Sequence, residues 1–277
     1  MKNTDKKKRK KSYIFIYIFL SLLIIFSMIY IITYFLSKKA AIEESNLLNN
    51  DNKEIERDIS KEETNEMVID APNETVIQET ERMAKVRELK EVNNDIVGWL
   101  EIPDTNISYP VLQGADNEYY MNHNYKKEKS RNGSIFLTKD YDWEIPSSNL
   151  LIYGHNLNNG TMFQDLLKYA NESYYKEHPK IRFTTVEDDS EYEIIAVFRS
   201  RVYYQSEKNV FRYYFFVNAE NEEEYNQFIE NAKRESLYHI DATAQYGDQL
   251  ITLSTCSYHV KDGRFAVVGR KCGKLSN

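Results

Sequence analysis

One of the two cysteines in this 277-residue chain, Cys256, occupies a position where a thiol can act as a nucleophile. It ends the segment 249–256, whose aliphatic and β-branched residues predict a strand. A cysteine at the C-terminal end of a strand is held on a rigid support at the rim of a sheet, where loops begin. Such a thiol becomes reactive when a neighbouring base or cation favours the thiolate form.

Arg264 follows Cys256 by eight residues and starts the strand predicted over 264–270. If residues 257–263 form the connecting loop, antiparallel pairing of the two strands returns Arg264 to a position beside Cys256. A guanidinium keeps its charge and presents several N–H donors. It can therefore stabilise a thiolate, or the oxyanion that forms when a thiolate attacks an amide carbonyl.

Two plainer interpretations apply to Cys256. A lone cysteine in a strand often serves as a small buried apolar side chain, and an exported protein can keep a disulfide, here with Cys272. If position 264 lies opposite 256, Cys272 pairs near position 248, roughly 26 Å along the sheet at about 3.3 Å per residue. Because a disulfide needs Cα atoms within about 7 Å, we expect no bond between the two cysteines.

His155 is the candidate acid and base. It follows the apolar strand predicted over 149–154 and begins a polar turn, so its imidazole also lies at a rim. Imidazole titrates near neutral pH and can protonate a leaving amine, then deprotonate an incoming one. Spacing alone leaves His259, a neighbour of Cys256, as a rival. No histidine pair has i, i+4 spacing and the cysteines form no Cys-x-x-Cys pair, so no metal site is expected.

Short segments rich in β-branched and aromatic residues must position these side chains. They are separated by polar or glycine-containing stretches and predict strands at 96–102, 107–112, 134–138, 149–154, 180–185, 191–200, 249–256 and 264–270. This density of strands predicts an all-β barrel or sandwich with helical insertions.

Three helices are predicted around these strands. One covers 76–92 and leads into the domain. A second begins at Thr161, where Gln164 three residues later completes a capping-box pattern. The third covers 221–236, because Tyr225, Phe228, Ile229 and Ala232 share one helical face opposite a face of acids.

The N-terminus predicts a membrane anchor. Seven Lys or Arg residues and one acid precede an uncharged run of 24 residues over 13–36. Such a run is long enough for a helix to cross a bilayer, which takes about 20 residues, and longer than the apolar region of a signal peptide. We expect residues 1–12 in the cytoplasm, a single transmembrane helix over 13–36, a polar spacer over 37–75 and an extracellular domain over 76–277. A cleaved signal peptide would export the same domain.

Charge and composition exclude several classes of protein. The net charge is −7 even though the N-terminus is basic, so the rest of the chain is acidic and unsuited to binding nucleic acid. Nine glycines and five prolines are too few for a collagen-like or low-complexity chain, and two cysteines are too few for a disulfide scaffold.

The segment Thr252 to Cys256, Thr-Leu-Ser-Thr-Cys, resembles the TLxTC signature of sortases, and Ser254 is the central residue common in class B. Arg264 matches the catalytic Arg of that family, and the segment 153–156, Tyr-Gly-His-Asn, resembles the strand end that carries its catalytic His. The resemblance covers about residues 80–272 and includes the segments 94–100, 107–111, 113–117, 133–136 and 159–163.

This resemblance implies an eight-stranded sortase β-barrel with an N-terminal helical extension, and identifies the helix over 221–236 as the class B helix before the Cys-bearing strand. It also implies that Cys256 attacks the carbonyl after Thr in a C-terminal sorting motif of the NPQTN or (S/P)PxTG kind. The thioacyl-enzyme is resolved by an amine of a peptidoglycan precursor. His155 is implied as acid and then base, and Arg264 as the residue that binds the substrate backbone and stabilises the oxyanion. The implied partners are secreted proteins with C-terminal sorting signals, and no cofactor is implied.

Four residues match positions that line the substrate groove of the family: Asn117, Met121, Tyr153 and Ser254. Met121 stands where Leu is usual, and Asn117 and Tyr153 could equally serve turn formation and core packing. The loop 200–216 departs from the family, because residues 211–216 lack the Thr of its Thr-x-Phe pattern. This loop reads the motif in class B enzymes, so the preferred motif stays open.

Two other functions remain open on the sequence. A membrane-tethered cysteine peptidase would use the same three residues and pass its acyl group to water; transfer to a supplied amine distinguishes it from a transpeptidase. A non-catalytic extracellular binding module would keep its function after Cys256→Ala.

Overall fold

The chain divides into two compact units, residues 1–62 and 63–277. The computed structural model describes residues 19–33, 35–36, 39, 80–145 and 147–275. In the first unit, residues 19–33 are helical and exposed.

No helix among the described residues is both long enough and apolar enough to cross a membrane. The transmembrane helix predicted over 13–36 is therefore not found there. Part of that prediction, residues 13–18 and 34, lies outside the described residues, as does the predicted spacer apart from Lys39.

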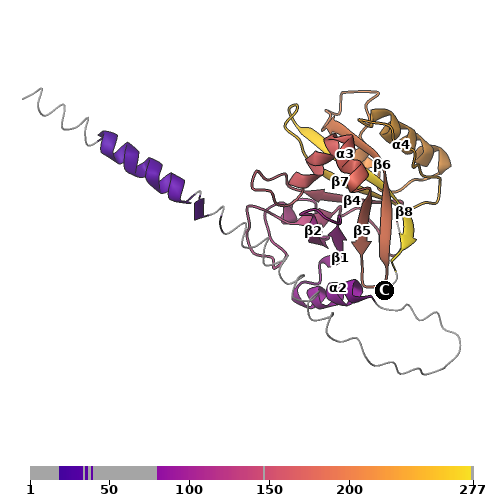
Figure 1. Cartoon of the computed structure of the whole chain (residues 1–277), viewed down its shortest axis with the longest axis horizontal. Helices are drawn as coiled ribbons and strands as arrows, with labels where there is room; N and C mark the ends of the chain where they lie inside the picture. The colour runs from indigo at the N-terminus through magenta and orange to yellow at the C-terminus, as the bar shows by residue number, and fades with distance from the viewer. Residues whose placement is uncertain (1–18, 34, 37–38, 40–79, 146, 276–277) are drawn as a thin grey trace, which may run out of the picture. The chain divides into compact units, whose positions relative to one another are not determined.

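Within residues 80–145 and 147–275, eight strands close into one barrel in the order β1-β2-β3-β4-β7-β8-β6-β5 (Figure 1). The pairs β2–β3 and β4–β7 are parallel, and the other neighbouring pairs are antiparallel. The eight-stranded barrel that the resemblance implied is thus confirmed, and of the two architectures that the strand pattern allowed, barrel or sandwich, the structure is the barrel. Its strands are β1 (Ile96–Glu101), β2 (Ser108–Leu112), β3 (Ile135–Leu137), β4 (Asn149–Gly154), β5 (Lys180–Thr184), β6 (Asp189–Arg201), β7 (Leu250–Cys256) and β8 (Gly263–Lys274).

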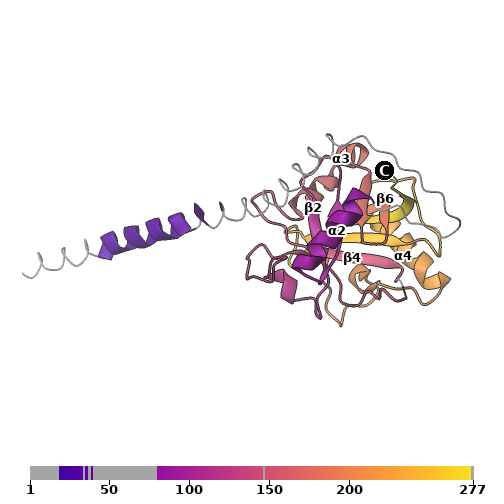
Figure 2. The same ribbon diagram turned by 90° about the horizontal axis from the view of Figure 1, so that it is seen from below.

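Helical segments cover the barrel and fill its connections. They are the α-helices α2 (Glu81–Val92), α3 (Glu172–Glu177) and α4 (Glu222–Glu235), and the 3-10 helices η1 (Tyr119–Met121), η2 (Gln164–Ala170) and η3 (Tyr213–Phe215). Helix α2 packs against β1 and β5 (Figure 1), and Figure 2 views the barrel from the side on which α2 lies. Its N-cap, Thr80, donates a hydrogen bond to the buried carboxylate of Asp189, which also pairs with Arg82, so the start of α2 is tied to β6. Of the helix predicted over 76–92, residues 76–79 lie outside the described part.

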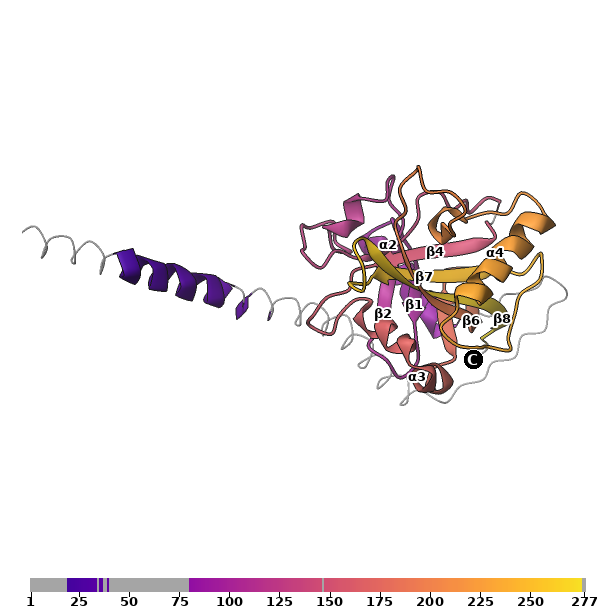
Figure 3. The same cartoon turned by 90° about the horizontal axis from the view of Figure 1, so that it is seen from above.

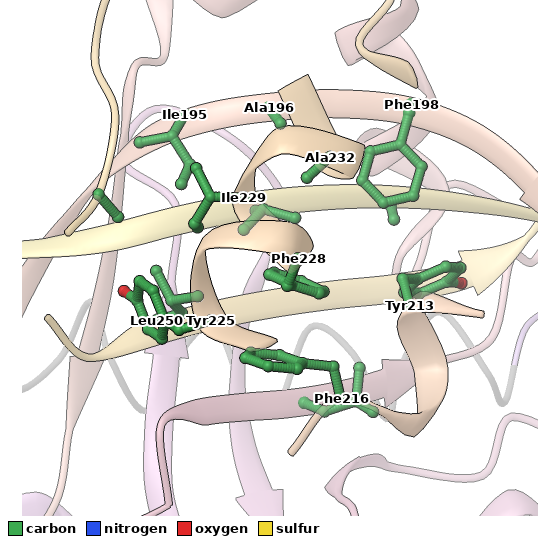
Figure 4. Close-up of a cluster of buried hydrophobic side chains, with 14 of the residues drawn as sticks. Ile195, Ala196, Phe198, Tyr213, Phe216, Tyr225, Phe228, Ile229, Ala232 and Leu250 are labelled. Atoms are coloured by element: carbon green, nitrogen blue, oxygen red, sulfur yellow. The ribbon is translucent and has the colours of Figure 1, made fainter. Parts of the chain in front are cut away.

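Helix α4 confirms the helix predicted over 221–236. Asn221 caps its first turn by accepting a hydrogen bond from the backbone N–H of Glu224. Its apolar face packs on β6 (Figure 3). Phe228 stacks on Phe216 with ring centroids 4.0 Å apart (Figure 4). The segment before β7 is therefore anchored by apolar burial, which contributes about 1.5–3 kcal/mol for a side chain of this size.

The prediction of a helix that begins at Thr161 is wrong about where the helix starts and about its type. Thr161 does not cap a helix, because its side chain and backbone N–H both donate to the side-chain oxygen of Asn159. Met162 has a left-handed backbone (φ 56°) and forms a bridge with Asn156, so the chain is still in a turn at this point. The helix begins only at Gln164 and is a 3-10 helix.

Candidate active site

The predicted nucleophile and the predicted cation are direct partners across the β7–β8 hairpin. Cys256 is paired in register with Arg264, as the loop length predicted. Both Cys256 and Cys272 are free thiols, which confirms that no disulfide joins them. The Cys272 thiol instead lies 3.1 Å from the ammonium of Lys180. The hairpin therefore keeps the two sulfur atoms apart and places Arg264 opposite Cys256.

The parallel pairing of β4 with β7 brings His155 to the same rim. Strands β4 and β7 run side by side (Figure 3), and their last paired residues are Gly154 and Thr255. The residues that follow this pair are His155 and Cys256. The Thr255 hydroxyl donates to the Gly154 carbonyl at 2.7 Å and reinforces this register. A Cβ atom at Gly154 would lie 2.8 Å from Cγ of the fully buried Phe163 ring and 2.4 Å from the end of the Ile135 side chain, so a larger residue would displace the packing here.

The imidazole of His155 is oriented by a backbone carbonyl. Its Nε2 atom lies 2.7 Å from the carbonyl oxygen of Met121. Because a carbonyl only accepts hydrogen bonds, Nε2 carries a hydrogen in this arrangement. In the neutral ring, Nδ1 is then the nitrogen that can take up a proton.

Gly133 holds this carbonyl in place. Its backbone is left-handed (φ 59°), and a Cβ atom there would lie 2.6 Å from the Met121 carbonyl oxygen and 2.7 Å from that of Tyr120. The loop between η1 and β3 can therefore approach this closely only with glycine. No pattern in the sequence predicted this contact, because it joins two loop segments that no periodicity links.

One cleft contains all three predicted catalytic side chains and all four predicted groove residues. Its lining comprises Asn117, Met121, Phe136, Tyr153, Gly154, His155, Ser254, Thr255, Cys256 and Arg264. Sequence reasoning missed Phe136, Gly154 and Thr255. Gly154 and Thr255 precede His155 and Cys256 directly, so the motifs themselves held a signal for them. The described residues contain no group of three or more His, Cys, Asp or Glu side chains that could hold a metal ion.

The rival histidine, His259, does not line this cleft. Its Nδ1 atom lies 2.9 Å from the Ser257 hydroxyl. Burial lowers the pKa of His259, and the charge of Arg199 lowers it further. The structure therefore favours His155 over His259 as the acid and base beside Cys256.

The guanidinium of Arg264 is held by a backbone carbonyl of its own strand. The Arg264 guanidinium donates to the carbonyl of Gly263 at 3.0 Å, and the side chain is half-buried. This bond uses one of several N–H donors that a guanidinium carries. Arg264 can thus bind a further acceptor in the cleft while its position is fixed.

The predicted groove residues differ in how their polar atoms are used. The Asn117 side-chain oxygen accepts a hydrogen bond from the Lys139 backbone N–H at 2.8 Å, so Asn117 also shapes a turn. Tyr153 packs against Phe136, and burial raises the pKa of Tyr153 to about 12, although the charge of Arg264 opposes this rise. Tyr153 therefore stays a neutral phenol at physiological pH.

Ser254 is hydrogen-bonded to a buried side chain outside the lining of the cleft. Its hydroxyl lies 2.7 Å from the phenol oxygen of Tyr213, a fully buried residue of η3. Burial raises the pKa of Tyr213, so this phenol is neutral as well. Tyr213 was not predicted as a site residue. The contact links the loop between β6 and α4 to the strand that carries Cys256.

Comparison with known proteins agrees with this geometry. A family model described as the sortase domain matches residues 100–272. Sortase B of Listeria monocytogenes is 37% identical over 190 residues, which cover 67% of this chain and 73% of that protein. Sortase B of Staphylococcus aureus is 32% identical over 184 residues, covering 66% and 72%.

Solved structures show the same similarity. The Staphylococcus aureus sortase B–substrate complex has a TM-score of 0.62 at 30% identity and covers 70% of this chain and 87% of its own. Sortase B from Listeria monocytogenes has a TM-score of 0.58 at 36% identity, with coverage of 67% and 99%. A closed barrel with a thiol, an imidazole and a guanidinium in one cleft defines a cysteine transpeptidase of the sortase type. The chain belongs to the sortase family, and its relatives place it in class B.

Proposed function

We propose that this chain cleaves a C-terminal sorting motif of the NPQTN or (S/P)PxTG kind after Thr and transfers the protein to an amine of a peptidoglycan precursor. The observation that carries the proposal is the shared cleft of Cys256, His155 and Arg264. Support also comes from two similar solved structures. One is the Staphylococcus aureus sortase B–substrate complex. The other is a sortase B complexed with triglycine, whose structure has a TM-score of 0.63 at 30% identity and covers 72% of this chain and 89% of its own.

In the proposed first half-reaction, the Cys256 thiolate attacks the carbonyl carbon of the motif's Thr and a C–S bond forms. The carbonyl electron pair moves to oxygen, and the Arg264 guanidinium stabilises this oxyanion. When the electrons return, the C–N bond breaks and His155 donates a proton to the leaving amine. The product is a thioacyl-enzyme.

In the proposed second half-reaction, an incoming amine loses a proton to His155 and attacks the thioester. A new C–N bond forms, the C–S bond breaks, and the Cys256 thiolate is restored. The Met121 carbonyl keeps Nε2 of His155 protonated throughout, so Nδ1 is the atom that passes the proton in both directions.

We further propose that the uncharged run over 13–36 anchors the protein as a single-pass membrane protein with the catalytic domain outside. The support is the sequence: an uncharged run of 24 residues after a basic N-terminus. Expression of the full chain in a Gram-positive host, followed by membrane fractionation and external protease treatment, tests this. The domain should stay with the membrane fraction and be degraded by external protease; recovery of intact domain in the soluble fraction would refute the anchor.

The enzymatic proposal is tested with residues 80–277 and quenched sorting-motif peptides, with and without triglycine. We expect cleavage of at least one motif, formation of a triglycine-linked product, and loss of both in Cys256→Ala. Release of acid alone, with no amine product, would support a peptidase instead. Unchanged cleavage in Cys256→Ala would refute the mechanism.

A further inference from the structure

The parallel ladder between β4 and β7 stops just short of the two reacting side chains. Its last pair is Gly154 and Thr255. In a parallel ladder, a residue bonds to the residues before and after the one opposite it. The Leu250 N–H donates to the Ser148 carbonyl, so alternate residues of β7 from Leu250 onward make these bonds, and Cys256 is one of them. If the ladder continued, the Cys256 carbonyl would therefore accept a hydrogen bond from the backbone N–H of Asn156.

The side chain of Asn156 takes over that bond. Its amide nitrogen donates to the Cys256 carbonyl at 3.1 Å. The backbone of Asn156 meanwhile lies opposite Met162, as an antiparallel bridge in the turn that follows. The chain can thus leave the sheet after Gly154, while the side-chain amide of Asn156 still donates a hydrogen bond to the Cys256 carbonyl.

The turn that carries Asn156 is itself fixed to the barrel. The Phe163 N–H donates to the His155 carbonyl at 2.8 Å, and the Met162 N–H donates to the Tyr109 phenol at 3.0 Å. Asn156 is therefore a donor on a rigid support. Its side-chain bond links the residue that follows His155 to the backbone of Cys256, which lies 100 residues beyond Asn156 in the chain.

We propose that Asn156 is a positioning residue for the transpeptidation reaction. It fixes the peptide unit of Cys256 relative to His155 through its side-chain amide, and so sets the direction from which the sulfur meets the substrate carbonyl. This inference rests on the proposed function, because it takes Cys256 as the nucleophile and His155 as the acid and base. Asn156 does not touch the substrate; removing its donor changes the rate of the chemical step.

Three variants test this role in a Cys272→Ser background, which leaves Cys256 as the single thiol. Asn156→Ala removes the amide, and Asn156→Asp keeps the shape but loses the N–H donor. Asn158→Ala is the matched control, because Asn158 is an exposed residue of the same turn. The measurements are kcat and KM for motif peptides, the rate of Cys256 alkylation by iodoacetamide between about pH 5 and pH 9, and the thermal midpoint.

We expect kcat to fall about 10- to 100-fold in Asn156→Ala and Asn156→Asp, because displacements of about 1 Å near a reacting group have effects of this size. KM should change less than about twofold, since the groove is intact. Alkylation at pH 7 should be slower than in the control, and the thermal midpoint should stay within about 4 °C.

A kcat in Asn156→Ala within about twofold of the Asn158→Ala value would overturn the proposal, as would full activity in Asn156→Asp. A lower kcat together with a raised KM and a lower thermal midpoint would assign Asn156 a structural role instead. If the parent protein cleaves no peptide, the proposed function fails, and the rate of Cys256 alkylation alone tests the positioning role of Asn156. A slower rate in Asn156→Ala then supports the positioning role, and an equal rate refutes it.

Discussion

Replacing Gly133 with alanine should impair catalysis by disturbing the imidazole of His155. The effect would pass through the Met121 carbonyl, which lies against both residues. An added Cβ atom would lie 2.6 Å from the Met121 carbonyl oxygen and 2.7 Å from the Tyr120 carbonyl oxygen. Ordinary contacts begin near 3.4 Å, so one of the two backbone segments must move by about 0.8 Å. The oxygen that His155 donates to belongs to one of these segments.

The consequence for His155 follows from the length of its hydrogen bond to the Met121 carbonyl. A shift of about 0.8 Å would lengthen the present 2.7 Å contact to roughly 3.5 Å, where a hydrogen bond is lost. The lost bond is worth about 0.5–1.5 kcal/mol, and the freed ring can rotate or change tautomer. We therefore expect kcat for peptide cleavage to fall about 10- to 100-fold, with a small change in KM.

Gly247→Ala is the matched control. Gly247 also has a left-handed backbone, with φ 100°, but a Cβ atom there meets nothing within 4 Å. Both substitutions carry a backbone penalty of about 1–3 kcal/mol in the free energy of unfolding, and only Gly133→Ala adds the clash. Steady-state kinetics and urea unfolding of both variants separate the effects. If Gly133→Ala keeps a kcat within twofold of Gly247→Ala, the Met121 carbonyl does not control His155.

Three further outcomes are expected. Phe228→Ala should lower the free energy of unfolding by about 3–5 kcal/mol in urea titrations, because it empties a buried aromatic site; a loss below about 1 kcal/mol would contradict this. Tyr213→Phe should cost about 0.5–1.5 kcal/mol in the same assay and should change KM more than kcat, since it removes the partner of Ser254 in the groove; unchanged KM and stability would count against that link. Burial raises the pKa of Asp188, but hydrogen bonds from Lys271 and Ser190 outweigh it and hold this pKa below the usual value, so its stabilising effect is present above about pH 4 and disappears as the pH falls through the lowered pKa. Asp188→Asn should therefore be less stable than the parent at pH 7, with a difference that shrinks in unfolding measurements below about pH 4; a constant difference would show that its charge is not involved.

The local pairing in the site was predictable from the sequence. Cys256 and Arg264 are separated by a loop short enough for a hairpin, so their register follows from chain connectivity. Helix α4 was predictable for a similar reason, because its apolar face repeats with the helical period. Local structure of this kind depends on residues that are close together in the sequence.

Spacing in the sequence did not separate His155 from His259; only the resemblance of residues 153–156 to sortases favoured His155, and the arrangement of the strands supplies the physical reason. His259 is closer to Cys256 in the chain, but His155 reaches the cleft through a parallel pairing of two strands about 100 residues apart. Such a pairing depends on the order in which the whole barrel closes, and no local pattern encodes it. The same holds for the Met121 carbonyl and for the Asn156 side chain, because the sequence does not show which polar groups will meet until distant segments come together. The order of residues was enough to specify the reactive groups and the class of fold, whereas closure of the barrel settles which of those groups face one another and at what distance.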